Sequence, residues 1–157
     1  MKNRKLWQKA AALALAAVMA CATSVFAATY ESGYIDVEAG SKTYLVQSIL
    51  YEDGDGVYRA STWAQTKDSS KVPANYIGVK AELMSDDAGD VIAETAWKYN
   101  STTDYFMSAV TKKQVTPDRV YSRGQVKLYT GTKHITEYAP ETTYAGGSRA
   151  VPAALLS

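Results

Sequence analysis

Downstream of residue 28, apolar and polar residues alternate with the period of two that a half-buried β-strand requires. The alternation is clearest in residues 76–84. One side of this segment carries Ile77, Val79, Ala81 and Leu83, and the other carries Lys80 and Glu82. The turn residues of 85–90 separate it from residues 91–99, where Val91, Ala93, Thr95, Trp97 and Tyr99 share one side. This pattern predicts a β-hairpin.

Further strands follow the same pattern. Residues 42–51 and 57–66 flank the turn Glu52–Gly56 and predict a second hairpin. Residues 105–111 and 120–129 predict a third pair, joined by a connection that contains Pro117 and Asp118. Short flanking strands are expected at 30–37 and 134–138. In 120–129, the inner row is Val120, Ser122, Gly124, Val126 and Leu128, and the outer row is Tyr121, Arg123, Gln125, Lys127 and Tyr129.

Strand candidates recur at intervals of roughly a dozen residues, which is typical of all-β domains. We therefore expect an antiparallel β-sandwich or partly closed barrel of about seven or eight strands, formed as a single domain by residues 28–139. Residues 140–157 contain two prolines and a Gly pair and are expected to be loosely ordered. The expected core comprises Ile35, Val37, Leu45, Ile49, Trp63, Ile77, Val79, Leu83, Val91, Trp97, Phe106, Val126 and Leu128.

Residues 1–27 have the three parts of an export signal. Lys2, Arg4, Lys5 and Lys9 give a positive start, Ala10–Ala20 is apolar but too short to span a bilayer, and Val25–Ala27 suits cleavage before Ala28. We expect a bacterial protein that is secreted. The segment Val18-Met19-Ala20-Cys21 resembles the site at which bacterial lipoproteins are cut, so a lipid anchor on Cys21 is the alternative.

Charge and cysteine content exclude several classes of function. Four of the 17 Lys and Arg residues and none of the 16 Asp and Glu residues precede Ala28, which leaves 13 against 16 and a net charge of −3. A mildly acidic domain argues against nucleic acid as a partner. The only cysteine, Cys21, lies in the signal, so the mature chain is expected to be disulfide-free. No apolar run after Ala28 is long enough for a membrane span.

Two acidic turns suggest a weak calcium site as the one candidate for a cofactor. If successive strands run up and down, the turns at 52–56 and 85–90 emerge at the same end of the sheet. Calcium binds six to eight oxygen ligands in irregular geometry. The candidate ligands are Asp53, Asp55, Asp86, Asp87 and Asp90, although Asp and Gly are also simply the residues that tight turns use.

The outer row of 120–129 is the candidate ligand-binding surface. Tyr121, Arg123, Gln125, Lys127 and Tyr129 place aromatic and hydrogen-bonding side chains alternately along one strand. Aromatic rings stack on the apolar faces of sugars, while amide and guanidinium groups bind hydroxyls. A solvated sheet face of ordinary composition is the simpler interpretation.

No catalytic residues are assigned from the sequence. His134 is the only imidazole, and no Gly-x-Ser-x-Gly motif accompanies it. We therefore expect a secreted or cell-envelope protein that is not an enzyme and binds a cell-wall glycan, a peptide or a surface protein. The alternatives are a secreted antimicrobial or toxin-like protein and a secreted hydrolase. The oligomeric state is open.

Overall fold

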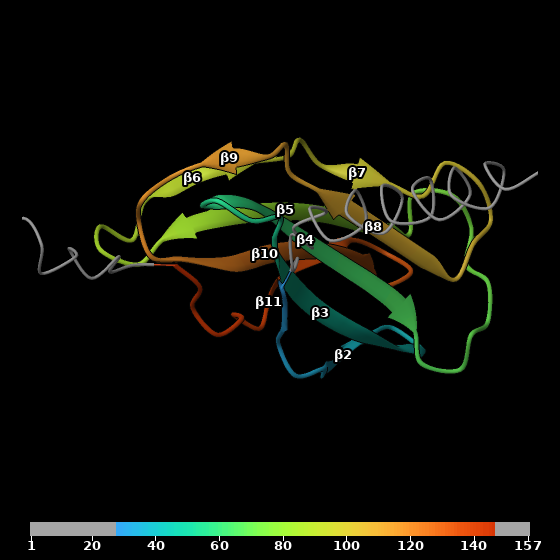
Figure 1. Cartoon of the computed structure of the whole chain (residues 1–157). Helices are drawn as coiled ribbons and strands as arrows, with labels where there is room; N and C mark the ends of the chain where they lie inside the picture. The colour runs from blue at the N-terminus through green and yellow to red at the C-terminus, as the bar shows by residue number, and fades with distance from the viewer. Residues whose placement is uncertain (1–27, 147–157) are drawn as a thin grey trace, which may run out of the picture.

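The computed structural model describes residues 28–146, which form two antiparallel β-sheets and no helix (Figure 1). No helix in this part of the chain could therefore cross a membrane. The expected export signal, the lipidation alternative at Cys21 and residues 147–157 of the expected tail lie outside the described residues.

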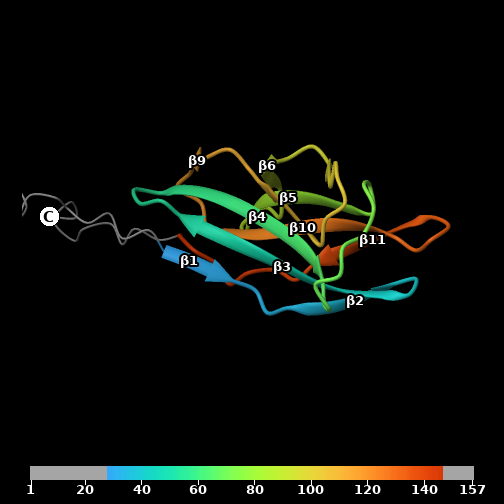
Figure 2. The same ribbon diagram turned by 90° about the vertical axis from the view of Figure 1, so that its right-hand side faces the viewer.

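Each sheet is built around two long strands. The six-stranded sheet contains β1 (Ala28–Glu31), β2 (Ile35–Ala39), β3 (Lys42–Glu52), β4 (Val57–Thr66), β8 (Phe106–Val110) and β9 (Gln114–Val115). The five-stranded sheet contains β5 (Ile77–Ser85), β6 (Val91–Glu94), β7 (Lys98–Tyr99), β10 (Val120–Tyr129) and β11 (His134–Ala139). The long strands run along the length of the molecule (Figure 2), and apolar side chains of both sheets pack together between them. The arrangement is sandwich-like.

The sequence predicted the all-β class and two hairpins, β3–β4 and β5–β6–β7, which form as expected. The expected strand count was too low, because residues 30–37 and 91–99 each form two strands and β9 forms in a connection. The alternative of a partly closed barrel was wrong, since the sheets are separate. The third hairpin was also wrong: β8 pairs with β4, whereas β10 pairs with β5 in the other sheet.

The end of the described chain follows β10. The Thr142 amide donates a hydrogen bond to the Ser122 carbonyl, and Ala145 and Val120 exchange two backbone hydrogen bonds. Residues 140–145 thus extend the edge that β11 begins.

The core consists of two apolar clusters separated by a band of small polar residues. The larger cluster contains Tyr44, Val46, Ile77, Val79 and Leu128, and the smaller contains Leu50, Leu83 and Val120. Between them lie buried Ser48, Thr62 and Ser122, one from each of three neighbouring strands. The hydroxyls of Ser48 and Thr62 have no hydrogen-bond partner within residues 28–146. Small side chains at these positions let the two sheets approach closely.

About half of the expected core is buried. Val37, Ile77, Val79, Leu83, Val126 and Leu128 lie in the core, as does the whole predicted inner row of β10. Leu45, Ile49, Trp63 and Phe106 instead lie on the outer face of the six-stranded sheet. Both alternate rows of β3 are largely apolar, so the pattern of that strand does not determine which row faces inward. Ile35 is partly exposed at the edge of its sheet.

Val91 and Trp97 were also wrongly placed in the core, because the strand that returns from β5 is irregular. A register shift lies between Leu83 and Met84, and Val91 is exposed opposite Met84. Between the pairs Glu82–Glu94 and Val79–Lys98, β5 advances three positions while the returning chain advances four. One extra residue moves every following side chain to the other side. Trp97 therefore lies on the outer face.

Candidate functional site

The outer face of the five-stranded sheet brings the predicted ligand-binding row together with residues of four other strands. The register places Arg123 opposite Glu82 and Gln125 opposite Lys80. On the same face, β11, the other neighbour of β10, places His134 opposite Tyr129. We call this surface the β10 face; it comprises Lys80, Glu82, Glu94, Trp97, Tyr99, Arg123, Gln125, Lys127, Tyr129, His134 and Tyr138.

A buried carboxylate holds the charged half of the β10 face together. Glu82 is only 2% exposed, and its oxygens lie 3.2 Å from Lys80 Nζ, 3.3 Å from Arg123 Nε and 2.9 Å from Gln125 Nε2. Lys80 Nζ also lies 2.5 Å from a Glu94 oxygen. The hydrogen bond that Lys80 donates to Glu94 is the main reason that the pKa of Lys80 is raised, with Glu82 adding to the rise and burial opposing it. Glu82 thereby fixes the positions of two predicted binding residues, Arg123 and Gln125.

The other half of the β10 face is a chain of aromatic rings. Their centroids are 6.4 Å apart for Trp97 and Tyr99, 6.0 Å for Tyr99 and His134, and 5.2 Å for His134 and Tyr129. Lys127 Nζ lies 4.4 Å from the centre of the Trp97 ring, a cation–π contact. The chain of rings therefore ends beside an ammonium group.

Two local features hold these rings in place. A side chain at Gly78 would meet the Tyr99 ring at 2.6 Å, so only glycine lets that ring lie across β5. The His134 Nε2 atom lies 2.8 Å from the Asn75 carbonyl oxygen, which fixes the imidazole beside Tyr129. The sequence analysis did not assign Trp97, Tyr99 or His134 to this face. A glycine inside an otherwise regular strand was the signal that a ring packs against the backbone there.

Tyr121 is separated from the rest of the predicted row. Its side chain is buried and packs edge-on against Tyr144, with ring centroids 5.1 Å apart. Burial raises the pKa of its hydroxyl. The structure therefore brings Arg123, Gln125, Lys127 and Tyr129 together on an accessible surface, whereas Tyr121 is covered.

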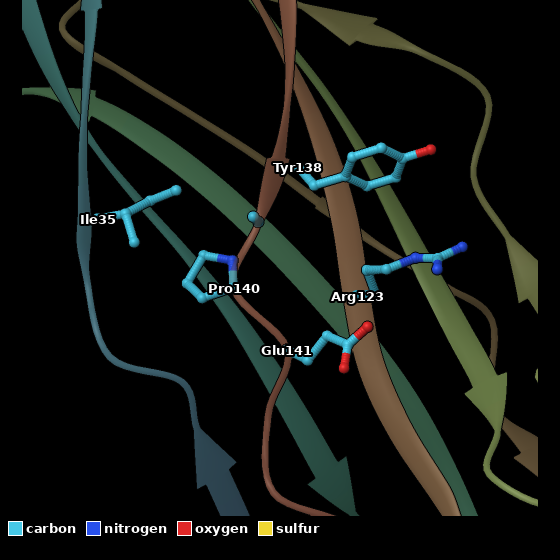
Figure 3. A pocket seen from close by; sticks show the side chains of 6 residues that line it. Ile35, Arg123, Tyr138, Pro140 and Glu141 are labelled. Atoms are coloured by element: carbon cyan, nitrogen blue, oxygen red, sulfur yellow. The ribbon is translucent and has the colours of Figure 1, made fainter.

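A shallow groove of about 410 Å³ lies at the margin of the β10 face, between β11 and β2 (Figure 3). Arg123 and Tyr138 form one side and Ile35 the other, with Pro140 and Glu141 between them. The Arg123 guanidinium carbon lies 5.2 Å from the Tyr138 ring centre. Tyr138 is 57% exposed, so the groove offers an aromatic surface and a guanidinium together.

The structure does not gather the predicted calcium ligands around one point. Asp53 forms ion pairs with Arg59 at 3.2 Å and Lys113 at 3.0 Å, and the contact with Lys113 is the main reason that its pKa is lowered. Asp86 pairs with Arg119 at 3.2 Å. Within residues 28–146, no three acidic or histidine side chains lie close enough to hold a metal ion together. A cation bound by Asp53 or Asp86 would have to displace the basic partners of these two residues.

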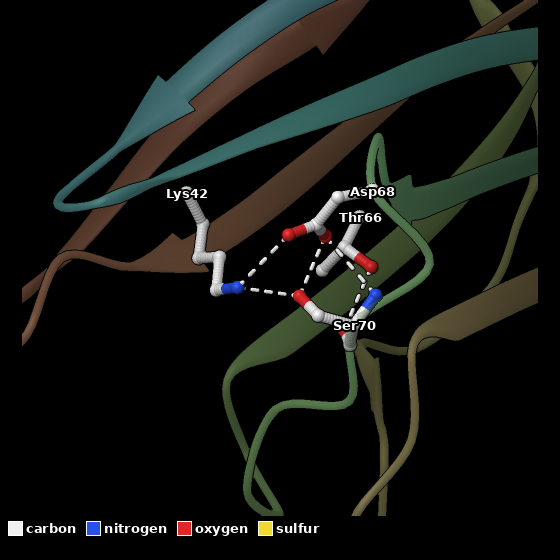
Figure 4. A network of polar contacts seen from close by, with 4 residues as sticks. All are labelled: Lys42, Thr66, Asp68 and Ser70. Atoms are coloured by element: carbon white, nitrogen blue, oxygen red, sulfur yellow. Dashed lines mark hydrogen bonds and ion pairs between the residues drawn. The ribbon is translucent and has the colours of Figure 1, made fainter.

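A serine–lysine–aspartate network closes the loop after β4 (Figure 4). Ser70 donates from its hydroxyl to Asp68 at 2.5 Å and from its amide to the same carboxylate at 3.0 Å, while Lys42 Nζ lies 3.2 Å from Asp68. Asp68 has a pKa of about 2, mainly because of the Ser70 hydroxyl. Lys42 Nζ also lies 2.5 Å from the Ser70 hydroxyl oxygen. A carboxyl as acidic as that of Asp68 is a weak proton acceptor at neutral pH, so Asp68 does not act as a general base toward Ser70.

We expect this network to be lost in acid. The folded-state pKa of Asp68 is below its ordinary value of 3.8, so its contribution to stability is complete above about pH 4 and is lost as the pH falls to about 2. Ser70→Ala should raise the pKa of Asp68 more than Lys42→Met does. A carboxyl-carbon NMR titration of the three proteins measures this, and an Asp68 pKa near 3.8 in the unaltered protein would contradict it.

Comparison with known proteins identifies no relative of this chain. No family model, curated protein or solved structure matches this chain significantly. Functional inference therefore depends on the geometry of the faces described above.

Proposed function

We propose that this chain is a secreted or cell-envelope protein that binds a glycan of the cell surface through the β10 face and catalyses no reaction on it. The observation that carries the proposal is the chain of rings from Trp97 to Tyr129 beside the amide of Gln125 and the ammonium of Lys127. Rings that stack on sugars, next to donors that bind hydroxyls, are the two components of a glycan site.

Two further features support binding rather than catalysis. Glu82 already binds Lys80, Arg123 and Gln125, so its carboxylate is occupied by neighbouring side chains. His134 Nε2 faces the Asn75 carbonyl. The basic start, apolar stretch and cleavage-site residues of the expected export signal at residues 1–27 separately support secretion.

Retention on insoluble polysaccharides and purified bacterial cell walls tests this function. We expect the mature protein to be retained, and Trp97→Ala to weaken binding about ten-fold, because it removes a stacking surface and the partner of Lys127. Tyr138→Ala should act in the same direction through the groove.

The matched control is Tyr105→Ala, which removes an exposed ring beside the end of β4 in the other sheet. This variant should bind as the unaltered protein does. The proposal fails if no wall or polysaccharide retains the protein, or if all three variants bind equally well.

A further inference from the structure

The carboxylates of the β10 face are occupied by side chains of the same face. Glu82 forms ion pairs with Lys80 and Arg123. It also accepts a hydrogen bond from Gln125, and Glu94 forms a second ion pair with Lys80. A cationic ligand, such as a glycan of free amino sugars, would therefore find no unoccupied carboxylate among these residues. The same contacts neutralise the charges of Lys80 and Arg123.

Lys127 is the cation of the β10 face that has no acidic partner. Among residues 28–146 it takes part in no ion pair, and its Nζ atom lies 4.4 Å from the centre of the Trp97 ring. The ring attracts the ammonium group but bears no net charge, so the charge of Lys127 is not compensated. Glu137 in the neighbouring strand β11 is paired with Val126 and lies on the opposite side of the sheet from Lys127. The ammonium group can therefore bind a negatively charged group of a ligand.

The end of the five-stranded sheet that carries the rings contains lysines and no acidic residue. Its segments are 74–80, 95–103 and 126–136, and none of them includes Asp or Glu. Lys98 and Lys133 are exposed there and, like Lys127, form no ion pair within the described chain. The acidic turn 85–90 lies at the other end of β5. The ring-bearing end is thus locally basic, although the mature chain has a net charge of −3.

We infer that the glycan bound by the β10 face is acidic and carries carboxylate or phosphate groups that pair with Lys127. This inference rests on the proposed function and names the ligand class of the same site. Lys98 and Lys133 adjoin Tyr99 and His134 in the chain, so their charges add to the attraction of an anionic polymer. A neutral glycan would gain nothing from the three lysine charges, and a cationic one would be repelled.

Titration calorimetry with polygalacturonate and with its fully methyl-esterified form tests this inference, because esterification removes the charge and keeps the sugar chain. In about 0.05 M salt, we expect the mature protein to bind the acid about ten-fold more tightly than the ester. In about 0.5 M salt most of this difference should disappear, because salt screens the attraction. Phosphorylated and dephosphorylated mannan provide the same comparison for phosphate. A preference in only one of the two comparisons identifies the anionic group that the site takes.

Lys127→Met should weaken binding of the acidic polymer about five-fold and leave binding of its neutral form within about two-fold. Methionine keeps an apolar stem over Trp97 and removes the charge, and Lys127→Arg should retain the preference. The matched control is Lys112→Met. Lys112 also forms no ion pair among the described residues, but it lies between β8 and β9 of the other sheet. This variant should bind as the unaltered protein does, and circular dichroism of each variant establishes that it is folded.

Equal affinity for the charged and neutral forms of both polymers overturns the inference and leaves the proposed function standing, because a glycan is still bound. Equal weakening by Lys127→Met and Lys112→Met also overturns it, since net charge alone would then explain the preference. Duplex DNA bound as tightly as the acidic polymers would mean a site for any polyanion, which likewise overturns it. Failure to bind any glycan or cell wall overturns the proposed function as well.

Discussion

Replacing Gly124 by alanine is expected to lower the free energy of unfolding by about 3 kcal/mol, the largest effect of any change considered. A Cβ atom at this position would overlap Thr62 Oγ1 and would lie 2.7 Å from the backbone oxygen of Lys80. Gly124 faces the core where the two sheets approach across the polar band. A backbone oxygen cannot move aside without distorting the β5–β10 pairing, so relieving the overlap would itself destabilise the sheet.

Urea denaturation of Gly124→Ala and Gly33→Ala separates this contact from the general effect of losing a glycine. A Cβ at Gly33 meets nothing within 4 Å, so Gly33→Ala should change stability by no more than about 0.5 kcal/mol. Adding Thr62→Ala to Gly124→Ala should recover part of the loss, because it removes the overlapping oxygen. Equal stability of the two single variants would disprove close contact between the sheets at this point.

Replacing Glu82 by glutamine is expected to lower the free energy of unfolding by about 2 kcal/mol. The buried carboxylate is the partner of Lys80, Arg123 and Gln125, and its loss leaves Arg123 without a counter-charge. Breaking a buried ion pair costs about 3–5 kcal/mol, and partial exposure of Arg123 and the remaining Lys80–Glu94 pair reduce that figure here.

Glu94→Gln is the matched control, because it removes a carboxylate from the same lysine at a site that is 52% exposed. It should cost less than about 1 kcal/mol. A double-mutant cycle with Arg123→Met should show coupling with Glu82, since the two residues touch. If Glu82→Gln proved as mild as Glu94→Gln, the buried carboxylate would not organise the β10 face.

The inner row of β10 shows that the sequence pattern can predict which side of a strand is buried. Val120, Val126 and Leu128 alternate with long polar residues, so only one assignment of the two sides is consistent with burial, and it was confirmed. In β3 both rows are apolar, and the choice of Leu45 over Val46 as a core residue was wrong. Burial of apolar side chains identifies the inward side of a strand only where one side is apolar and the other is polar.

The alternation of apolar and polar residues along β10 also allowed part of the β10 face to be predicted. Arg123, Gln125, Lys127 and Tyr129 share a side because neighbouring positions alternate, which is a local property of the chain. Trp97 and Tyr99 join them through an extra residue in the strand that returns from β5, a feature with no clear signal in composition. The alternation placed Glu82 on the side of its strand that carries Lys80, and there Lys80, Arg123 and Gln125 surround it and leave it only 2% exposed.

The sequence by itself determined the all-β class, the two local hairpins, the faces of β10 and the absence of a cysteine after residue 21. Only the tertiary structure decided which row of β3 is buried, which sheet each of β8 and β10 joins, and which rings gather around Lys127. The physical reason is the distance along the chain over which each kind of interaction acts. Alternation and turn chemistry act between residues close together in the chain, whereas sheet pairing and packing depend on which distant surfaces exclude water together.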